Sequence, residues 1–247
     1  MDESYARNLD QTGQHYMIDP DLIKFIVNNA ELEKDDIVLE IGYGKGSLTK
    51  ELLKKCKVIA VDTEEYKFDV KDAKNVIFIN DNILQIFNEL YEKYTFNKIV
   101  ANIPYNISEP LMRLIFKKHK ELELVVLTIG QHFADLLTRN DNRIGIIASH
   151  MYDIDLLKTV KPRSFSPPPR VDSEVILLEP KSDALSDMYV KLIMLDDRKL
   201  KNAFEKIFFE KTKRQVKELT KHPLFDKKLY ELSNKEFMEL DELLTKI

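Results

Sequence analysis

The residue types best suited to chemistry in this chain stand in the tetrapeptide Asn102-Ile103-Pro104-Tyr105. It follows the run Asn97-Lys-Ile-Val-Ala101, which reads as a short buried strand. Open α/β sheets bind ligands at the carboxyl ends of their strands. The Asn side chain and the Pro carbonyl offer two acceptors for the N–H hydrogens of a planar amine. The Tyr105 ring can stack on the same molecule. A plain strand-to-helix turn is the alternative, because Asn and Pro are common turn residues.

A glycine-rich motif, Glu40-Ile-Gly-Tyr-Gly-Lys-Gly46, follows the first predicted strand and opens a helical pattern. Its glycines let the backbone turn tightly and approach a ligand closely. The G-x-G-x-G spacing differs from the G-x-G-x-x-G of dinucleotide-binding proteins and so disfavours a nicotinamide-dependent dehydrogenase. We therefore expect Gly42 and Gly44 to bind another cofactor.

Polar side chains follow the next strands in the same way. Asp62 ends the second predicted strand, Asp81 the third and Asn102 the fourth. A carboxylate at position 62 can accept both hydroxyls of a ribose, and the segment around Asp81 can read the exocyclic amine of an adenine. The series predicts a pocket for an adenosine-containing cofactor. S-Adenosyl-L-methionine fits best, since it has no pyrophosphate to place on a helix N-terminus.

Seven short apolar runs predict the strands that position these residues. They cover residues 37–41, 58–61, 76–79, 99–101, 124–127, 144–149 and 174–178. Continuous apolar runs of this length are typical of strands buried on both faces, as in parallel sheets. Helical patterns lie between them, for example at 46–55 and 108–118, and another helix begins at Asp19-Pro20. The alternation predicts an α/β fold with a Rossmann-like, doubly wound sheet.

The pattern changes at Pro180, because the rest of the chain is helical and amphipathic. We expect a catalytic domain at residues 1–180 and a small α-helical, RNA-contacting domain at 181–247. Residues 198–228 carry eleven Lys and Arg against four Asp and Glu, and such a stretch can follow a phosphate backbone. A solvated helix face is the alternative interpretation of these charges.

Composition excludes several other classes of protein. The 247 residues are 44% apolar with a net charge of −4, which argues against a uniformly basic nucleic-acid binder. No apolar run reaches the ~18 residues of a membrane span, and the N-terminal residues lack the apolar stretch of a secretory signal. Cys56 is the only cysteine, so neither an internal disulfide nor a Cys-based zinc site is expected, and no other cluster suggests a metal. We expect a cytoplasmic monomer.

Three motifs, in this order, resemble the KsgA-type rRNA adenine N6,N6-dimethyltransferases and the related Erm-type enzymes. They are Glu40-Ile-Gly-Tyr-Gly-Lys-Gly-Ser-Leu-Thr49, Asn102-Ile-Pro-Tyr-Asn-Ile-Ser108 and Phe165-Ser-Pro-Pro-Pro-Arg-Val-Asp-Ser173. The resemblance covers residues 11–215, and Val171-Asp172-Ser173 is closer to the KsgA-type form. It implies a class I methyltransferase fold, S-adenosyl-L-methionine as cofactor, and the rRNA of the small ribosomal subunit as partner.

The resemblance also implies a role for each site residue. Cofactor binding is expected of His15, Met17, Gly42, Gly44, Asp62, Asp81 and Asn102. Asn102 and the Pro104 carbonyl would bind the amine of the target adenine, with Tyr105 and Phe165 stacking on the base. Extruding the base removes its stacking in the RNA, and the two rings would offset that loss. For Phe165, a core aromatic beside a Pro-rich turn is the alternative.

Some positions depart from the family pattern. His15 replaces the usual Asn, Asp62 is one carbon shorter than the usual Glu, and the segment 63–75 is short for the family's second helix. The leading hypothesis is an enzyme that dimethylates adenine N6 in small-subunit (16S) rRNA, with a role in ribosome biogenesis. The alternatives are an Erm-like 23S rRNA methyltransferase and a catalytically weakened assembly or RNA-binding factor of the same fold.

Overall fold

The computed structural model describes residues 14–66, 69, 73–139, 141–182, 199–207, 217–218, 220–228 and 231–244. Contacts divide the chain into two compact units. The first comprises Met1–Asp135 and Tyr152–Pro180, and the second comprises Leu136–Met151 and Lys181–Ile247. Residues 136–151 thus group with the C-terminal segment, whereas the division expected from the sequence kept them with the sheet.

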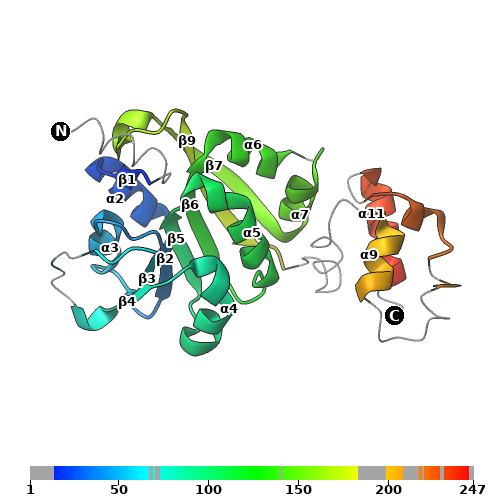
Figure 1. Ribbon diagram of the computed structural model, residues 1–247, viewed down its shortest axis with the longest axis horizontal. Helices are drawn as coiled ribbons and strands as arrows, with labels where there is room; N and C mark the ends of the chain where they lie inside the picture. The colour runs from blue at the N-terminus through cyan, green and yellow to red at the C-terminus, as the bar shows by residue number, and fades with distance from the viewer. Residues whose placement is uncertain are drawn as a thin grey trace. The chain divides into compact units, whose positions relative to one another are not determined.

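The described part of the first unit is built on a seven-stranded sheet (Figure 1). Its strands are β2 (Ile37–Ile41), β3 (Lys57–Asp62), β4 (Val76–Asn80), β5 (Lys98–Asn102), β6 (Leu124–Gly130), β7 (Tyr152–Val160) and β9 (Ser173–Pro180). The strand order is β4-β3-β2-β5-β6-β9-β7, and β9 runs antiparallel to both of its neighbours. The chain winds outward in two directions from the β2–β5 pair, which is the switch point where such sheets bind ligands.

Helices cover both faces of this sheet. In Figure 1, α2 (Pro20–Asn29) and α3 (Ser47–Leu52) lie on one side, and α4 (Ile83–Tyr94) and α5 (Ser108–Lys117) lie on the other. The start of α2 is as expected, since the Asp19 side chain accepts hydrogen bonds from the backbone N–H groups of Asp21 and Leu22, at 3.1 and 3.2 Å. Its buried face consists of Leu22, Ile23, Ile26 and Val27. The predicted doubly wound α/β fold is confirmed.

The prediction of a strand at residues 144–149 is wrong. These residues belong to α7 (Arg143–Met151), and the strand is the next segment, β7. Residues 144–148 are all buried in the helix, and a short apolar run alone does not distinguish a buried helix from a strand buried on both faces. No apolar run marks β7 in the sequence, because most of its side chains are exposed or half-exposed.

A second sheet, of two short strands, joins distant parts of the first unit. Strand β1 (Tyr16–Met17) pairs antiparallel with β8 (Phe165–Ser166), so that Met17 lies opposite Phe165. The N–H of Ile18 donates to the Ser164 carbonyl at 3.0 Å and extends the pairing. The N-terminal residues Tyr16 and Met17 therefore lie beside the Pro-rich motif at 165–173, although about 150 residues separate them in the chain.

The described part of the second unit is helical. It contains α7, α9 (Leu200–Ile207) and α11 (Asn234–Leu244), with a 3-10 turn at Pro223–Asp226. Phe204 and Phe225 pack edge to face, with ring centroids 5.1 Å apart. His150 of α7 stacks on Phe237 of α11 at 4.3 Å, which explains why α7 groups with this unit.

The basic stretch is described only in part. Arg198, Lys211, Lys213 and Arg214 lie outside the described residues. The side chains of Lys199, Lys201, Lys217 and Lys221 are exposed. Across the ranges that the structure describes, no helix has the length and apolar character to cross a membrane.

Candidate active site

A cavity of about 220 Å³ lies at the carboxyl edge of the sheet, in the first unit. Every residue expected to bind the cofactor lines it: His15, Met17, Gly42, Gly44, Asp62, Asp81 and Asn102. Pro104 and Tyr105, expected to act on the target base, line it as well. Phe165 is not among the lining residues. The ends of β2, β3 and β5 thus meet where the sequence predicted.

The glycine loop after β2 has a backbone conformation that lets a ligand approach it closely. Gly42 has φ +75° and Gly44 has φ +46°, a left-handed conformation that side chains with a Cβ rarely adopt. A Cβ on Gly44 would lie 2.8 Å from a ring carbon of Tyr16, and one on Gly42 would lie 3.3 Å from the Asn102 carbonyl oxygen. Glycine is therefore required here by both the backbone and the neighbours.

Asp62 lies at the end of β3 and faces this loop. Its carboxylate accepts hydrogen bonds from the N–H groups of Gly44, at 2.9 Å, and Glu64, at 3.1 Å. Burial raises the pKa of Asp62 above its ordinary value, while the two N–H donors lower it in part. A carboxylate has about four lone-pair sites, so Asp62 retains capacity to accept the hydroxyls of a ribose.

Glu40 is a site residue that the sequence analysis did not select. Its side chain is 1% exposed and lines the cavity. Burial raises its pKa to about 8, an effect that Thr49 offsets in part. Among the described residues, its Oε2 has no hydrogen-bond partner. A buried carboxyl oxygen without a partner beside a cavity fits a cationic group of a ligand. The available signal was its place as the first residue of the glycine motif.

Asp81 follows β4 and lines the same cavity. Its N–H donates to the Asp62 carbonyl at 2.9 Å, which ties the two strand ends together. Its own carboxylate accepts from the Asn82 N–H at 2.6 Å, and Asn82 in turn caps α4 through the Leu84 N–H at 3.0 Å. The exposed Asp81 side chain is thus held at the rim.

Asn102 is oriented by a residue far away in the chain. Its Nδ2 donates to the main-chain oxygen of His15 at 3.0 Å, which leaves Oδ1 as an acceptor on a side chain that lines the cavity. The Pro104 carbonyl accepts from the Ile107 N–H at 3.1 Å and keeps its second lone pair. The His15 imidazole is fixed too, because Nδ1 lies 2.9 Å from the Pro167 carbonyl and must donate to it.

Tyr105 presents a half-buried ring beside these acceptors. A Cβ on Gly130 would lie 3.5 Å from the ring, so the ring lies against the backbone at the end of β6. The His15 ring lies 5.7 Å away, centroid to centroid, tilted by 34°. The Tyr105 hydroxyl shares a 2.5 Å hydrogen bond with Ser173 Oγ. Burial raises the pKa of this phenol.

Phe165 lies in the core and not in the cavity. Its side chain is 2% exposed and belongs to the apolar cluster that contains Met17. The alternative interpretation, a core aromatic beside a Pro-rich turn, describes this arrangement. The stacking role expected of Phe165 remains a prediction that the present geometry does not support.

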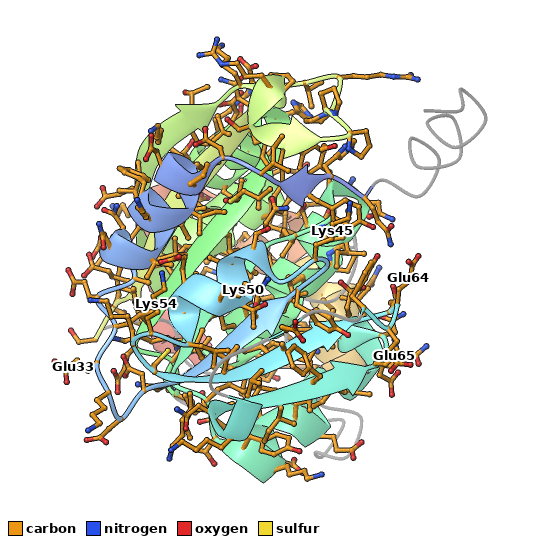
Figure 2. The ribbon with its side chains drawn as sticks, turned by 90° about the vertical axis from the view of Figure 1, so that its left-hand side faces the viewer. Glu33, Lys45, Lys50, Lys54, Glu64 and Glu65 are labelled. Atoms are coloured by element: carbon orange, nitrogen blue, oxygen red, sulfur yellow. The ribbon has the colours of Figure 1, made fainter. Side chains whose placement is uncertain are left out.

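A cluster of polar contacts joins the N-terminal segment to the loop after β3. Tyr16 bonds to Gln14 Oε1 at 3.0 Å and to the Tyr66 hydroxyl at 2.8 Å. The Tyr66 hydroxyl also lies 2.9 Å from Glu64, and Gln14 Nε2 donates to the same carboxylate at 3.0 Å. The two phenol protons are therefore shared among three contacts. Figure 2 shows Glu64 on the side of the molecule where Lys45 lies, and the Lys45 ammonium is 4.9 Å from the Tyr16 ring centroid. Since Gln14, Tyr16 and Tyr66 line the cavity, this polar cluster forms part of its wall.

The family model for ribosomal RNA adenine dimethylase matches residues 6–242. This chain belongs to the ribosomal RNA adenine dimethylase family. A probable ribosomal RNA small subunit methyltransferase A of Methanococcus aeolicus is 31% identical, covering 95% of this chain and 88% of the relative. Its counterpart from Pyrococcus abyssi is 30% identical, with 95% and 91% covered. One from Methanopyrus kandleri is 37% identical over 69% of this chain, and the match spans 63% of that relative's length.

Solved structures agree with the family. A dimethyladenosine transferase from Plasmodium falciparum has a TM-score of 0.67 and 25% identity, covering 94% of this chain and 97% of that one. The 23S rRNA methyltransferase ErmE, 19% identical, has a TM-score of 0.57 with 93% and 99% covered, and shares the fold. These findings confirm the predicted family, the class I methyltransferase fold, the enzyme class, and S-adenosyl-L-methionine as cofactor.

Proposed function

We propose that this chain transfers methyl groups from S-adenosyl-L-methionine to the N6 amine of adenines in small-subunit rRNA, giving N6,N6-dimethyladenine. The observation that carries the proposal is the orientation of Asn102, whose Nδ2 is engaged by His15 so that Oδ1 remains for the amine. The named relatives from Methanococcus aeolicus and Pyrococcus abyssi, which are small-subunit methyltransferases, support the choice of substrate.

The cavity residues fit the cofactor in three places. The orphaned Oε2 of Glu40 suits the ammonium of its methionine part, and Asp62 suits the ribose hydroxyls. Asp81 would read the adenine edge, while the left-handed glycine loop leaves the space that a Cβ would fill. When bound, the cofactor supplies an electrophilic methyl group on a sulfonium.

The chain's own residues would act mainly by positioning the target amine. The N6 lone pair of adenine is delocalised into the ring, which makes the amine a poor nucleophile. Acceptors at Asn102 Oδ1 and the Pro104 carbonyl would take its two N–H hydrogens and favour a pyramidal nitrogen. Holding the reacting atoms in this geometry supplies most of the rate gain. No base is needed before transfer, since the product cation sheds its proton readily.

Tyr105 would hold the extruded base. Its ring lies beside both acceptors and can stack on the adenine, at a gain of about 1–3 kcal/mol per base. This offsets part of the stacking that ends when the base leaves its helix. In the present geometry the base would find its platform in Tyr105 alone, because Phe165 is buried in the core.

We also propose an RNA-contacting surface, a cellular location and an oligomeric state for the enzyme. The exposed Lys199, Lys201, Lys217 and Lys221 would contact rRNA phosphates as part of an RNA-contacting C-terminal domain. We assign the reaction to the cytoplasm, where small subunits assemble, with the enzyme acting as a monomer.

The test is to incubate the protein and S-adenosyl-L-methionine with small ribosomal subunits that lack the modification, and to map methylated adenines by primer extension and mass spectrometry. Dimethyladenine in small-subunit rRNA is expected, and the Asn102→Ala variant should produce none. Methylation of large-subunit rRNA alone would favour the Erm-like alternative. Cofactor binding without transfer to either subunit would favour the weakened assembly factor.

A further inference from the structure

The Val171-Asp172-Ser173 motif lies beside the active site because of the direction of β9. The parallel strands end at the cavity edge of the sheet, and β9, which is antiparallel, begins there. Its first residue, Ser173, is opposite Gly130, the last residue of β6. Ser173 is fully buried, at 0% exposure. A serine that no cofactor-binding or amine-binding step uses therefore sits at the edge where the target base is expected.

Ser173 has one side-chain contact that reaches the site. Its Oγ shares the 2.5 Å hydrogen bond with the hydroxyl of Tyr105, across 68 residues of sequence. The Tyr105 ring is bounded on one side by the Gly130 backbone, so the ring has both a surface to lie on and an anchor at its tip. A ring held at both places cannot swing about its Cα–Cβ bond, so its position is fixed before any base arrives.

The residue before Ser173 holds the start of β9 in place. The Asp172 carboxylate pairs with Lys161 Nζ at 2.5 Å, and its carbonyl accepts from the Gln131 N–H at 3.0 Å. The first of these contacts joins β9 to the end of β7, and the second joins it to the start of α6 (Gln131–Thr138). The position of Ser173 Oγ is thus set from several directions, as an anchor requires.

We propose that Ser173 is a positioning residue that holds the Tyr105 ring in place, so that the extruded adenine meets a preset stacking surface. The inference rests on the proposed function, because it assigns a role in handling the base of that reaction. A fixed ring loses less conformational freedom on binding than a rotating one. Holding the ring in place should therefore increase kcat/KM for RNA methylation and leave cofactor binding unchanged.

The experiment is a double-mutant cycle on kcat/KM for methylation of unmodified small subunits. Tyr105→Phe keeps the ring but removes the anchor, and the loss of one hydrogen bond predicts a fall of about 2- to 10-fold. The kcat/KM of Ser173→Ala should fall at least as far, since this variant leaves the phenol without its buried partner. In the Tyr105→Phe background, Ser173→Ala should have no further effect. Cofactor affinity should stay at the wild-type value in all three variants.

Ser108→Ala is the matched control. Ser108 is also a buried serine next to the site, at 1% exposure, and its Oγ has no hydrogen-bond partner among the described residues. The same deletion there should leave kcat/KM unchanged. An equal loss in Ser108→Ala would mean that any buried serine near the site matters. An unchanged Tyr105→Phe enzyme, or a Ser173→Ala effect that persists in that background, would overturn the proposal.

A second measurement separates this inference from the proposed function. With labelled tyrosine, the NMR resonances of the Tyr105 ring should shift and broaden in Ser173→Ala relative to wild type and Ser108→Ala, because the released ring can move about its Cα–Cβ bond. Unchanged ring resonances overturn the anchor role, whatever RNA the enzyme methylates. If Ser173→Ala changes the ring resonances but the wild-type protein leaves small subunits unmethylated, the proposed substrate is refuted and the anchor role of Ser173 stands.

Discussion

Replacing Glu40 by Gln tests whether a buried carboxyl governs both stability and cofactor binding. Burial raises the pKa of Glu40 from 4.5 to about 8. Between those two values the unfolded chain gives up the proton while the folded chain keeps it. Because the unfolded state then binds fewer protons than the folded state, the free energy of unfolding decreases as the pH rises through this window.

The size of the effect follows from the shift. Each pH unit inside the window changes the free energy of unfolding by about 1.4 kcal/mol, so Glu40 should lower stability by about 3 kcal/mol between pH 4.5 and pH 7. Glu40→Gln removes this titration and leaves every other group in place. The stability difference between variant and wild type should therefore grow by that amount over the range. Urea unfolding at several pH values measures it, and parallel stability curves would refute the buried-carboxyl reasoning.

Cofactor binding should depend on the same proton. If the ionised carboxylate holds the cofactor's ammonium, binding must release the proton that Glu40 carries below pH 8. The affinity of wild type should then rise by about tenfold between pH 6 and pH 7, with close to one proton released in calorimetry run in two buffers. Glu40→Gln should bind more weakly and without this pH dependence. Equal affinity in the variant would remove Glu40 from the site.

Four further changes test other parts of the site. Asp62→Ala should weaken cofactor binding by about 1.5–3 kcal/mol, the value of hydrogen bonds to a charged group; calorimetry with unchanged affinity would exclude Asp62 from ribose binding. Gly44→Ala should abolish cofactor binding, because its Cβ would clash with Tyr16 at 2.8 Å; a retained affinity would show that Tyr16 moves without loss. Tyr66→Phe removes a hydroxyl from the polar cluster at the cavity wall and should speed cofactor dissociation, measured by filter binding, while Tyr94→Phe, outside the cavity, should not. Replacing Lys199 and Lys201 together by Gln should flatten the salt dependence of RNA binding by about one unit of slope for each phosphate that is no longer bound; an unchanged slope would assign these charges to a solvated face.

The cofactor side of the cavity could be predicted because its residues are local to strand ends. Gly42, Asp62, Asp81 and Asn102 each follow an apolar run, and parallel strands bring such positions to one edge. The structure places all four on one cavity. Glu40 was missed because a carboxyl's importance here depends on its burial and its lack of a partner, and neither property is visible in a motif.

Other features depend on tertiary contacts that the hydrophobic periodicity of the sequence does not reveal. The run at 144–149 is apolar on all sides because α7 packs within the second unit, where His150 meets Phe237. β7 was missed because an edge strand next to β9 exposes much of its surface. The burial of Phe165 depends on its pairing with Met17 across β1 and β8, a contact between segments that no pattern in the sequence joins.

The base side of the site is built almost entirely from such distant contacts. Asn102 is oriented by His15, Tyr105 is anchored by Ser173, and His15 is fixed by Pro167. Each pair joins segments separated by 68 to 152 residues, whereas the cofactor side follows one strand end after another. Substitutions at Ser173 should therefore disturb methylation of RNA before they disturb cofactor binding. Changes at Phe165 or Pro167 should disturb both, because these residues contact Met17 and His15. The Pro-rich motif then acts as the support on which the amine-binding tetrapeptide is aligned, and its own side chains need not touch the base.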